Sequence, residues 1–254
     1  MHALTITVYF YFADMLKSYM QLEIKVFPMS LKLLSSHDTG GACYAACFHQ
    51  DGKLLIGCHN GICVFSDDYD EADHLLKSAN VASIASLGDR NSYAFVSHKR
   101  NRREVGKTLS ADFRDWEEIF NFDCKNNYAA HITASAKFAV ACADKGLVAY
   151  DLETKAKVLK PLGFQPAVVR FDSKENLLLT SSHTLYKYSM DKHGELTPIW
   201  TCEDIAYPGG IAFTRYGDIV VQSLENREIF VISPQGLFYF FYFENLHYIT
   251  CFQG

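Results

Sequence analysis

Three histidines have a spacing that could hold a metal ion. His59 follows Lys53 by six residues, His98 follows Ser92 by six, and His183 follows Asn176 by seven. Three imidazoles facing a common centre could bind zinc or iron and leave one position open for water, as hydrolytic metal sites do. The competing interpretation, that each histidine caps a polar hairpin tip, is favoured. Histidines from separate repeat units would lie too far apart, because a metal needs its ligands within about 2.1 Å.

The densest positive charge is the run His98-Lys-Arg-Asn-Arg-Arg, which stands out against a formal net charge of -5. Such a run attracts a phosphate backbone or an acidic peptide. The alternative is an ordinary solvated hairpin tip, since charge runs are often just exposed loops. The candidate partner-binding residues are Lys99, Arg100, Arg102, Arg103, Lys107 and, from a later hairpin, Arg227.

Other chemistry has little support. The eight cysteines lie mostly inside apolar runs, which favours buried thiols. A zinc site built from Cys43, Cys47, Cys58, His59 and Cys63 is the alternative, but no Cys-x-x-Cys pair supports it. The sequence contains no Gly-x-Ser-x-Gly, no P-loop and no Gly-x-Gly-x-x-Gly after a strand. We therefore expect no catalytic residue and no cofactor.

The composition predicts a folded domain rich in strands. Hydrophobic residues make up 49% of the chain, charged residues 21% and aromatic residues 14%, and aromatic side chains suit a pleated, half-buried surface. A sequence pI near 6.0 gives no general attraction for DNA or an anionic membrane. The apolar run 3–12 is too short to cross a bilayer and lacks the features of a signal peptide, so a cytoplasmic location is expected.

A repeat of about forty residues runs through the sequence, which is the length of four short strands with their turns. Apolar runs begin at a similar point of each unit, after Lys53, Ser92, Lys137, Asn176 and Asp218. A second apolar run follows in four of the units, at Gly61, Gly146, Thr184 and Glu228. Small-residue strands precede the first runs, as in Ala45-Ala-Cys-Phe, and a fourth strand is plainest at residues 237–243.

Four antiparallel strands in every unit predict an all-β fold, a β-propeller, as a single domain over residues 1–254. Residues 42–243 account for five blades. Residues 246–252 repeat the first strand of a unit, and residues 1–36 contain strands that would complete it. We therefore expect six blades, the sixth assembled from both termini, because this closure removes exposed sheet edges.

The fifth unit resembles an NHL repeat. It reads Tyr207-Pro-Gly-Gly-Ile-Ala-Phe-Thr-Arg-Tyr-Gly-Asp-Ile-Val-Val and continues to Asn226-Arg-Glu-Ile-Phe-Val-Ile. Gln222 and Ser223 depart from the family pattern, which commonly has an acidic residue there. The resemblance extends to the C-terminal domain of tripartite-motif (TRIM-NHL) proteins and implies recruitment of a substrate or RNA to a ubiquitin ligase. The sequence contains no RING or B-box pattern, so ubiquitin transfer by this chain itself is not expected.

Two functions follow from these observations. The favoured one is a non-catalytic binding platform, with a protein partner or single-stranded RNA held on the face formed by the turns between second and third strands. No membrane or DNA partner is expected. The alternative is a metal-dependent propeller hydrolase or lyase of the lactonase type, with its ligands at the mouth of the central channel.

Overall fold

We describe a computed structural model of the chain, covering residues 43–48, 53–59, 61–65, 72–76, 80–87, 92–99, 102–108, 115–123, 131–203, 205–214, 216–226 and 228–241. These residues form β-strands joined by turns and loops, with no α-helix among them. The described part of the chain accordingly has no helix with the length and apolar character that crossing a bilayer requires.

The strands form five four-stranded antiparallel sheets, each built from consecutive strands. Blade 1 consists of β1 (Cys43–Phe48), β2 (Leu54–Cys58), β3 (Gly61–Phe65) and β4 (Ala72–Leu76). Blade 2 consists of β5 (Asn80–Ser86), β6 (Tyr93–Lys99), β7 (Arg102–Thr108) and β8 (Trp116–Asp123). Blade 3 consists of β9 (Ile132–Ala134), β10 (Phe138–Ala143), β11 (Gly146–Asp151) and β12 (Lys157–Pro161). Blade 4 consists of β13 (Val169–Phe171), β14 (Leu177–Thr180), β15 (Leu185–Met190) and β16 (Leu196–Cys202). Blade 5 consists of β17 (Pro208–Phe213), β18 (Ile219–Ser223), β19 (Glu228–Ile232) and β20 (Phe238–Phe241).

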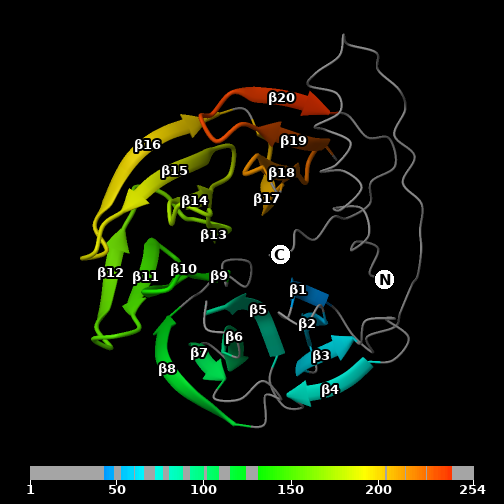
Figure 1. Cartoon of the computed structure of the whole chain (residues 1–254), viewed down its shortest axis with the longest axis vertical. Coiled ribbons are helices and arrows are strands. Elements are labelled where there is room, and N and C mark those ends of the chain that lie inside the picture. The colour runs from blue at the N-terminus through cyan, green and yellow to red at the C-terminus, as the bar shows by residue number, and fades with distance from the viewer. Residues whose placement is uncertain are drawn as a thin grey trace.

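The five sheets are arranged as the blades of a β-propeller. Figure 1 shows them around a common centre in chain order, with β1, β5, β9, β13 and β17 innermost and β4, β8, β12, β16 and β20 at the periphery. The prediction of a propeller with four-stranded blades is confirmed, but the predicted number of six blades is not, because the described residues form five. The sixth blade was assigned to residues 1–36 and 246–252, which lie outside the described residues.

The repeat in the sequence matches the second strand of every blade. Each second strand begins one residue after the position that the repeat marks, so that β2 follows Lys53 and β18 follows Asp218. The third strands β3, β11 and β19 begin at the marked residues themselves, and β15 begins one residue after Thr184. Alternating apolar residues of these central strands face both neighbouring blades, which explains why the period was visible in the sequence.

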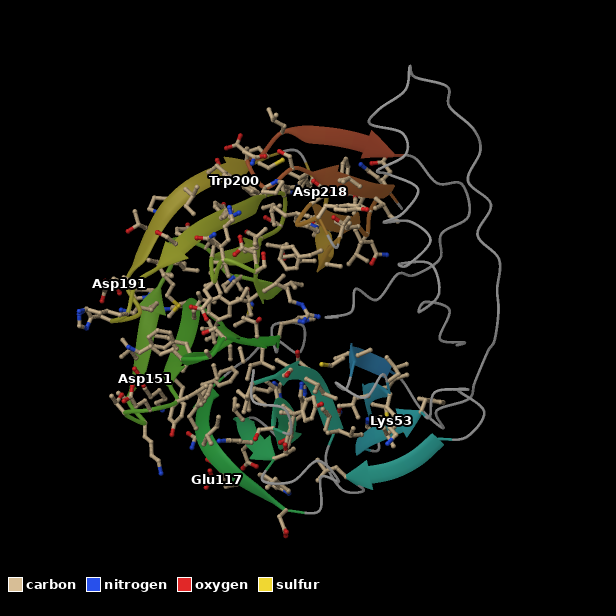
Figure 2. All side chains as sticks on the ribbon, viewed as in Figure 1. Lys53, Glu117, Asp151, Asp191, Trp200 and Asp218 are labelled. Atoms are coloured by element: carbon tan, nitrogen blue, oxygen red, sulfur yellow. The ribbon has the colours of Figure 1, made fainter. Side chains whose placement is uncertain are left out.

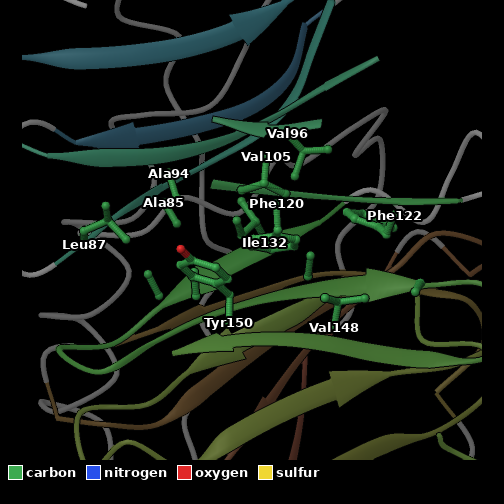
Figure 3. Packing of buried hydrophobic residues seen from close by; sticks show 14 residues of the cluster. Ala85, Leu87, Ala94, Val96, Val105, Phe120, Phe122, Ile132, Val148 and Tyr150 are labelled. Carbon is green, nitrogen blue, oxygen red and sulfur yellow. The ribbon is translucent and has the colours of Figure 1, made fainter. Parts of the chain in front are cut away.

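Adjacent blades bury apolar side chains between them. The contact of blades 2 and 3 contains Val96, Val105 and Phe120 on one side and Ile132 and Tyr150 on the other (Figure 3). The rings of Phe120 and Tyr150 are stacked, with centroids 5.2 Å apart. Similar clusters join blades 1 and 2, 3 and 4, and 4 and 5. The blades therefore depend on one another for burial of their cores.

Buried hydroxyls also link the innermost strands. The backbone N–H of Ile132 donates to Ser83 Oγ at 3.1 Å, which joins blade 3 to blade 2. The backbone N–H of Phe171 donates to Thr133 Oγ1 at 3.1 Å, which joins blade 4 to blade 3. An innermost strand has one edge without a strand partner, and these hydroxyls satisfy part of it.

Short polar side chains fix the turns at the periphery. Asp151 Oδ1 accepts from the backbone N–H groups of Glu153 and Thr154, and Asp191 Oδ1 accepts from those of His193 and Glu195. Figure 2 shows Asp151 and Asp191 at the edge of the ring. Such bonds hold a turn in one conformation, so the strands they connect keep their register.

Candidate functional site

The turns between second and third strands lie at one end of the blades, and we call the surface they form the turn face. Because the strands of a blade alternate in direction, the connection into the next blade reaches this same face. Backbone hydrogen bonds link the two kinds of segment. The N–H of Leu162 donates to Lys145 O, and that of Ile205 donates to His183 O. The turns of the turn face comprise residues 59–60, 100–101, 144–145, 181–184 and 224–227.

The predicted basic tip is the turn between β6 and β7 on this face. Lys99 ends β6 and Arg102 begins β7, but their side chains, like Arg100 and Arg227 as a whole, lie outside the described part of the chain. Arg103 is only 1% exposed, so its guanidinium does not lie on the surface. Partner binding by the tip stays a prediction.

Lys107 does not belong to that tip. It is half-buried near the far end of β7, where it is opposite Ala94 on β6 and Glu117 on β8. The structure therefore separates Lys107 from the residues with which the sequence grouped it.

The three histidines that could have formed a metal site fall into two places. His59 and His98 lie near the contact of blades 1 and 2, whereas His183 lies in blade 4. Among the described residues, no group of three or more His, Cys, Asp or Glu side chains is placed to hold a metal. Burial and the Arg103 guanidinium lower the pKa of His98 to about 4, so this imidazole is neutral at pH 7.

An asparagine that the sequence did not single out connects His59 with His98. Asn80 Nδ2 donates to His59 Nδ1 at 3.3 Å, and Asn80 is directly opposite His98 on the β5–β6 ladder. Asn80 Oδ1 and His98 Nε2 are both buried without a hydrogen-bond partner. Since buried polar atoms normally have partners, each of these two atoms has hydrogen-bonding capacity that the described residues do not use.

A second polar group lies at the centre of the ring. Arg170 is on the innermost strand β13 and is 8% exposed. Its charge acts on His131, before β9, and on Cys47, on β1. Burial, and then Arg170, lower the pKa of His131 to about 4. Burial raises the pKa of the Cys47 thiol to about 11, against the opposing effect of Arg170.

Among the described residues, the most exposed aromatic side chain of the turn face lies where blade 4 meets blade 5. Tyr207 is 54% exposed and adopts a left-handed backbone conformation with φ of 47°. The His183 ring contacts the Tyr207 ring edge-on, with centroids 5.2 Å apart. Leu224, 49% exposed, belongs to the next turn of the same face. We call His183, Tyr207 and Leu224 the aromatic platform.

Backbone hydrogen bonds hold Tyr207 in its conformation. Its N–H donates to Ser182 O at 2.9 Å, and its carbonyl accepts from the Leu224 N–H at 3.0 Å. Ser223 is fully buried, and its hydroxyl donates to Ala206 O at 2.6 Å. A bulky residue with positive φ is rare and costs free energy, so these contacts stabilise a strained residue whose ring remains exposed.

The glycine at position 209 allows Leu224 to lie over the start of β17. A Cβ at position 209 would come within 2.4 Å of the Leu224 side chain. The Pro-Gly-Gly sequence after Tyr207, which carried the NHL resemblance, therefore shapes the aromatic platform. From the sequence, Arg227 of the 224–227 turn was singled out as a candidate for partner binding, whereas Tyr207 appeared only as the first residue of the NHL-like stretch. The signal that could have pointed to Tyr207 is an aromatic residue directly before that tripeptide.

Comparisons with known proteins agree with the fold. No family model matches the sequence, and no curated protein matches it. Among solved structures, the chain is similar to virginiamycin B lyase from Staphylococcus aureus, with a TM-score of 0.61 and 15% identity over 82% of this chain and 71% of that one. A nidogen/laminin complex gives a TM-score of 0.64 and 11% identity, over 78% of this chain and 79% of that one. A streptogramin B lyase gives a TM-score of 0.62 and 16% identity, over 82% and 72%.

These structures have different functions, two being named as lyases and one as a complex between proteins. At such low identity the similarity establishes the fold alone. The chain is a β-propeller, and its function has to be argued from its own residues.

Proposed function

We propose that this protein is a non-catalytic binding platform that holds a partner protein on its turn face. The observation that carries the proposal is Tyr207, whose strained backbone is held by hydrogen bonds while its ring is 54% exposed. Strained residues concentrate at functional sites, and exposed tyrosines are common energetic centres of interfaces. The strained backbone and exposed ring of Tyr207 are therefore features typical of a recognition site.

The resemblance to TRIM-NHL domains fits this proposal and adds a role in recruiting substrates or RNA for a ubiquitin ligase. Arg100 and Arg102, in the β6–β7 tip, and Arg227, in the sequence of the 224–227 turn, would then enlarge the contact on the same face. We propose a cytoplasmic location for the protein, as expected from its sequence.

Affinity capture with three forms of the protein tests the proposal. Tyr207→Asn removes the ring and retains a residue that tolerates positive φ. Leu237→Ala is the control, because Leu237 is 63% exposed in the turn between β19 and β20, at the opposite end of the blade. A partner captured by the unmodified chain and by Leu237→Ala should bind Tyr207→Asn about tenfold more weakly or worse. Equal capture by all three forms would contradict the proposal.

Treating the extract with RNase separates the two kinds of partner. We expect capture to survive the treatment, as a protein partner requires. Loss of capture after RNase would instead assign the turn face to RNA.

The competing function is a metal-dependent hydrolase or lyase. The observation in its favour is the pair of buried atoms without partners, Asn80 Oδ1 and His98 Nε2, beside His59. Metal analysis of the purified protein decides between the two. Zinc or calcium bound tightly at one ion per chain, and lost in a His98→Gln variant, would favour the enzyme.

A further inference from the structure

The charge around the aromatic platform is negative. Glu203, before β17, and Glu225, next to Leu224, are both exposed. Neither forms an ion pair with another described residue. In the sequence, Asp204 is a second carboxylate of the 203–207 segment, and Arg227 is the one cation of the 224–227 segment. These two segments therefore carry three negative charges and one positive charge.

The hydrogen bonds already described bring these segments together. The Leu224 N–H donates to the Tyr207 carbonyl, so Glu225 is one residue from a direct contact with the loop that contains Glu203. An exposed tyrosine ring with carboxylates nearby has the chemistry to hold a guanidinium or an ammonium group. The cation is attracted to the face of the ring, and an arginine can also donate two parallel hydrogen bonds to a carboxylate.

We propose that the aromatic platform binds an arginine-bearing segment of a partner protein, with the cation over Tyr207 and within reach of Glu203 and Glu225. This inference rests on the proposed function and adds the chemical class of the ligand. Arginine suits the site better than lysine does, because its planar group can stack on the ring and pair with a carboxylate at once. Charge complementarity argues against a nucleic acid here, since phosphates would be repelled by the carboxylates.

A direct binding measurement tests the ligand class. The probe is a dye-labelled peptide of alternating glycine and arginine, followed by fluorescence anisotropy at low salt. Two matched probes accompany it: the same peptide with citrulline, which is neutral and nearly isosteric, and a labelled oligouridylate. We expect the arginine peptide to bind, the citrulline peptide to bind much more weakly, and added salt to weaken binding because exposed charges are screened.

Variants locate the site. Tyr207→Asn should weaken binding of the arginine peptide about 2- to 5-fold, the range expected for an exposed cation–π contact. Tyr207→Phe should retain most of the binding, because the ring remains. Glu203→Gln combined with Glu225→Gln should weaken binding and reduce its salt dependence. Glu153→Gln is the control for charge, since Glu153 is exposed in the turn between β11 and β12, at the opposite end of its blade.

The outcomes separate this inference from the proposed function. If Tyr207→Asn loses the captured partner while the arginine peptide does not bind, the platform stands and the ligand class is wrong. Binding of oligouridylate in preference to the arginine peptide also overturns the ligand class. If the peptide binds equally to the unmodified chain and to all variants, its binding lies elsewhere and the inference fails.

Discussion

Arg170, on the innermost strand β13, and His131, directly before β9, are ionisable residues that the sequence did not single out. Arg170 is buried on β13, and its positive charge reaches His131 and Cys47 from two other blades. A cation among buried side chains disfavours protonation of a nearby imidazole, and burial disfavours it further. His131 is therefore held neutral at the centre of the ring.

His131 should make folding sensitive to acid. Its pKa is about 4 in the folded protein and 6.5 in an ordinary environment, so between these values the unfolded chain holds a proton that the folded chain lacks. Above pH 6.5 this group does not lower the free energy of unfolding. As the pH decreases from 6.5 towards 4, the free energy of unfolding falls by up to about 1.4 kcal/mol per pH unit. Denaturant unfolding of His131→Gln across this range should show a shallower decline.

The matched control is His193→Gln, because His193 is exposed in the turn between β15 and β16. That variant should keep the decline of the unmodified protein. An unchanged pH dependence in His131→Gln would show that other groups are responsible for the loss of stability in acid.

At the scale of elements, hydroxyl side chains join innermost strands that have no strand partner on one edge. Ser83 and Thr133 are buried, and each accepts a hydrogen bond from the next blade's innermost strand. At the end of the blades opposite the turn face, Lys187 Nζ donates to Asp172 Oδ2, at 2.9 Å, and to Pro234 O, at 3.2 Å. Trp200 Nε1 donates to the same carbonyl. Polar contacts therefore add to the apolar clusters that hold neighbouring blades together.

Replacing Thr133 by valine keeps the shape of the side chain but removes the acceptor for the Phe171 N–H. An unsatisfied buried N–H costs about 1–3 kcal/mol, and we expect a loss of that size in the free energy of unfolding. The control Thr201→Val changes an exposed residue of β16 and should stay within about 0.5 kcal/mol. Equal stability of the two variants would mean that Phe171 finds another acceptor.

At the scale of the whole molecule, the feature to be tested is the closure of the ring. Five blades are described, and a sixth was predicted from the sequence of residues 1–36 and 246–252. A propeller without its closing blade leaves the apolar faces of its first and last sheets without a neighbour. We therefore keep the prediction that both termini contribute to one closing blade.

Deleting residues 1–36 tests this closure. If these residues complete a blade, the truncated chain should be largely insoluble or lose its cooperative thermal transition. Solubility and a melting curve measured beside the full chain give the answer. A truncated chain that is as soluble and as heat-resistant as the full one would show that the N-terminal segment is a tail.

The sequence by itself determined the class of fold, because the four strands of a blade are local in the chain and their alternation recurs at a regular period. The starts of β2, β6, β10, β14 and β18 were predicted to within one residue for this reason. The described residues form five blades and not the predicted six, and a blade assembled from both ends of the chain depends on long-range pairing, which leaves no local signal. The candidate site likewise depends on contacts between residues that are distant in the chain, which no local pattern indicates.

Only the tertiary structure decided which side chains meet. Arg103 is in a run of exposed type but is 1% exposed, because burial depends on the strands packed around β7. The spacing of His59, His98 and His183 allowed a metal-binding trio as an alternative to hairpin caps. Contacts between blades place the first two around Asn80 and the third against Tyr207. Spacing along a chain specifies a position within a blade, whereas a binding surface is made from several blades, and their relative placement depends on packing.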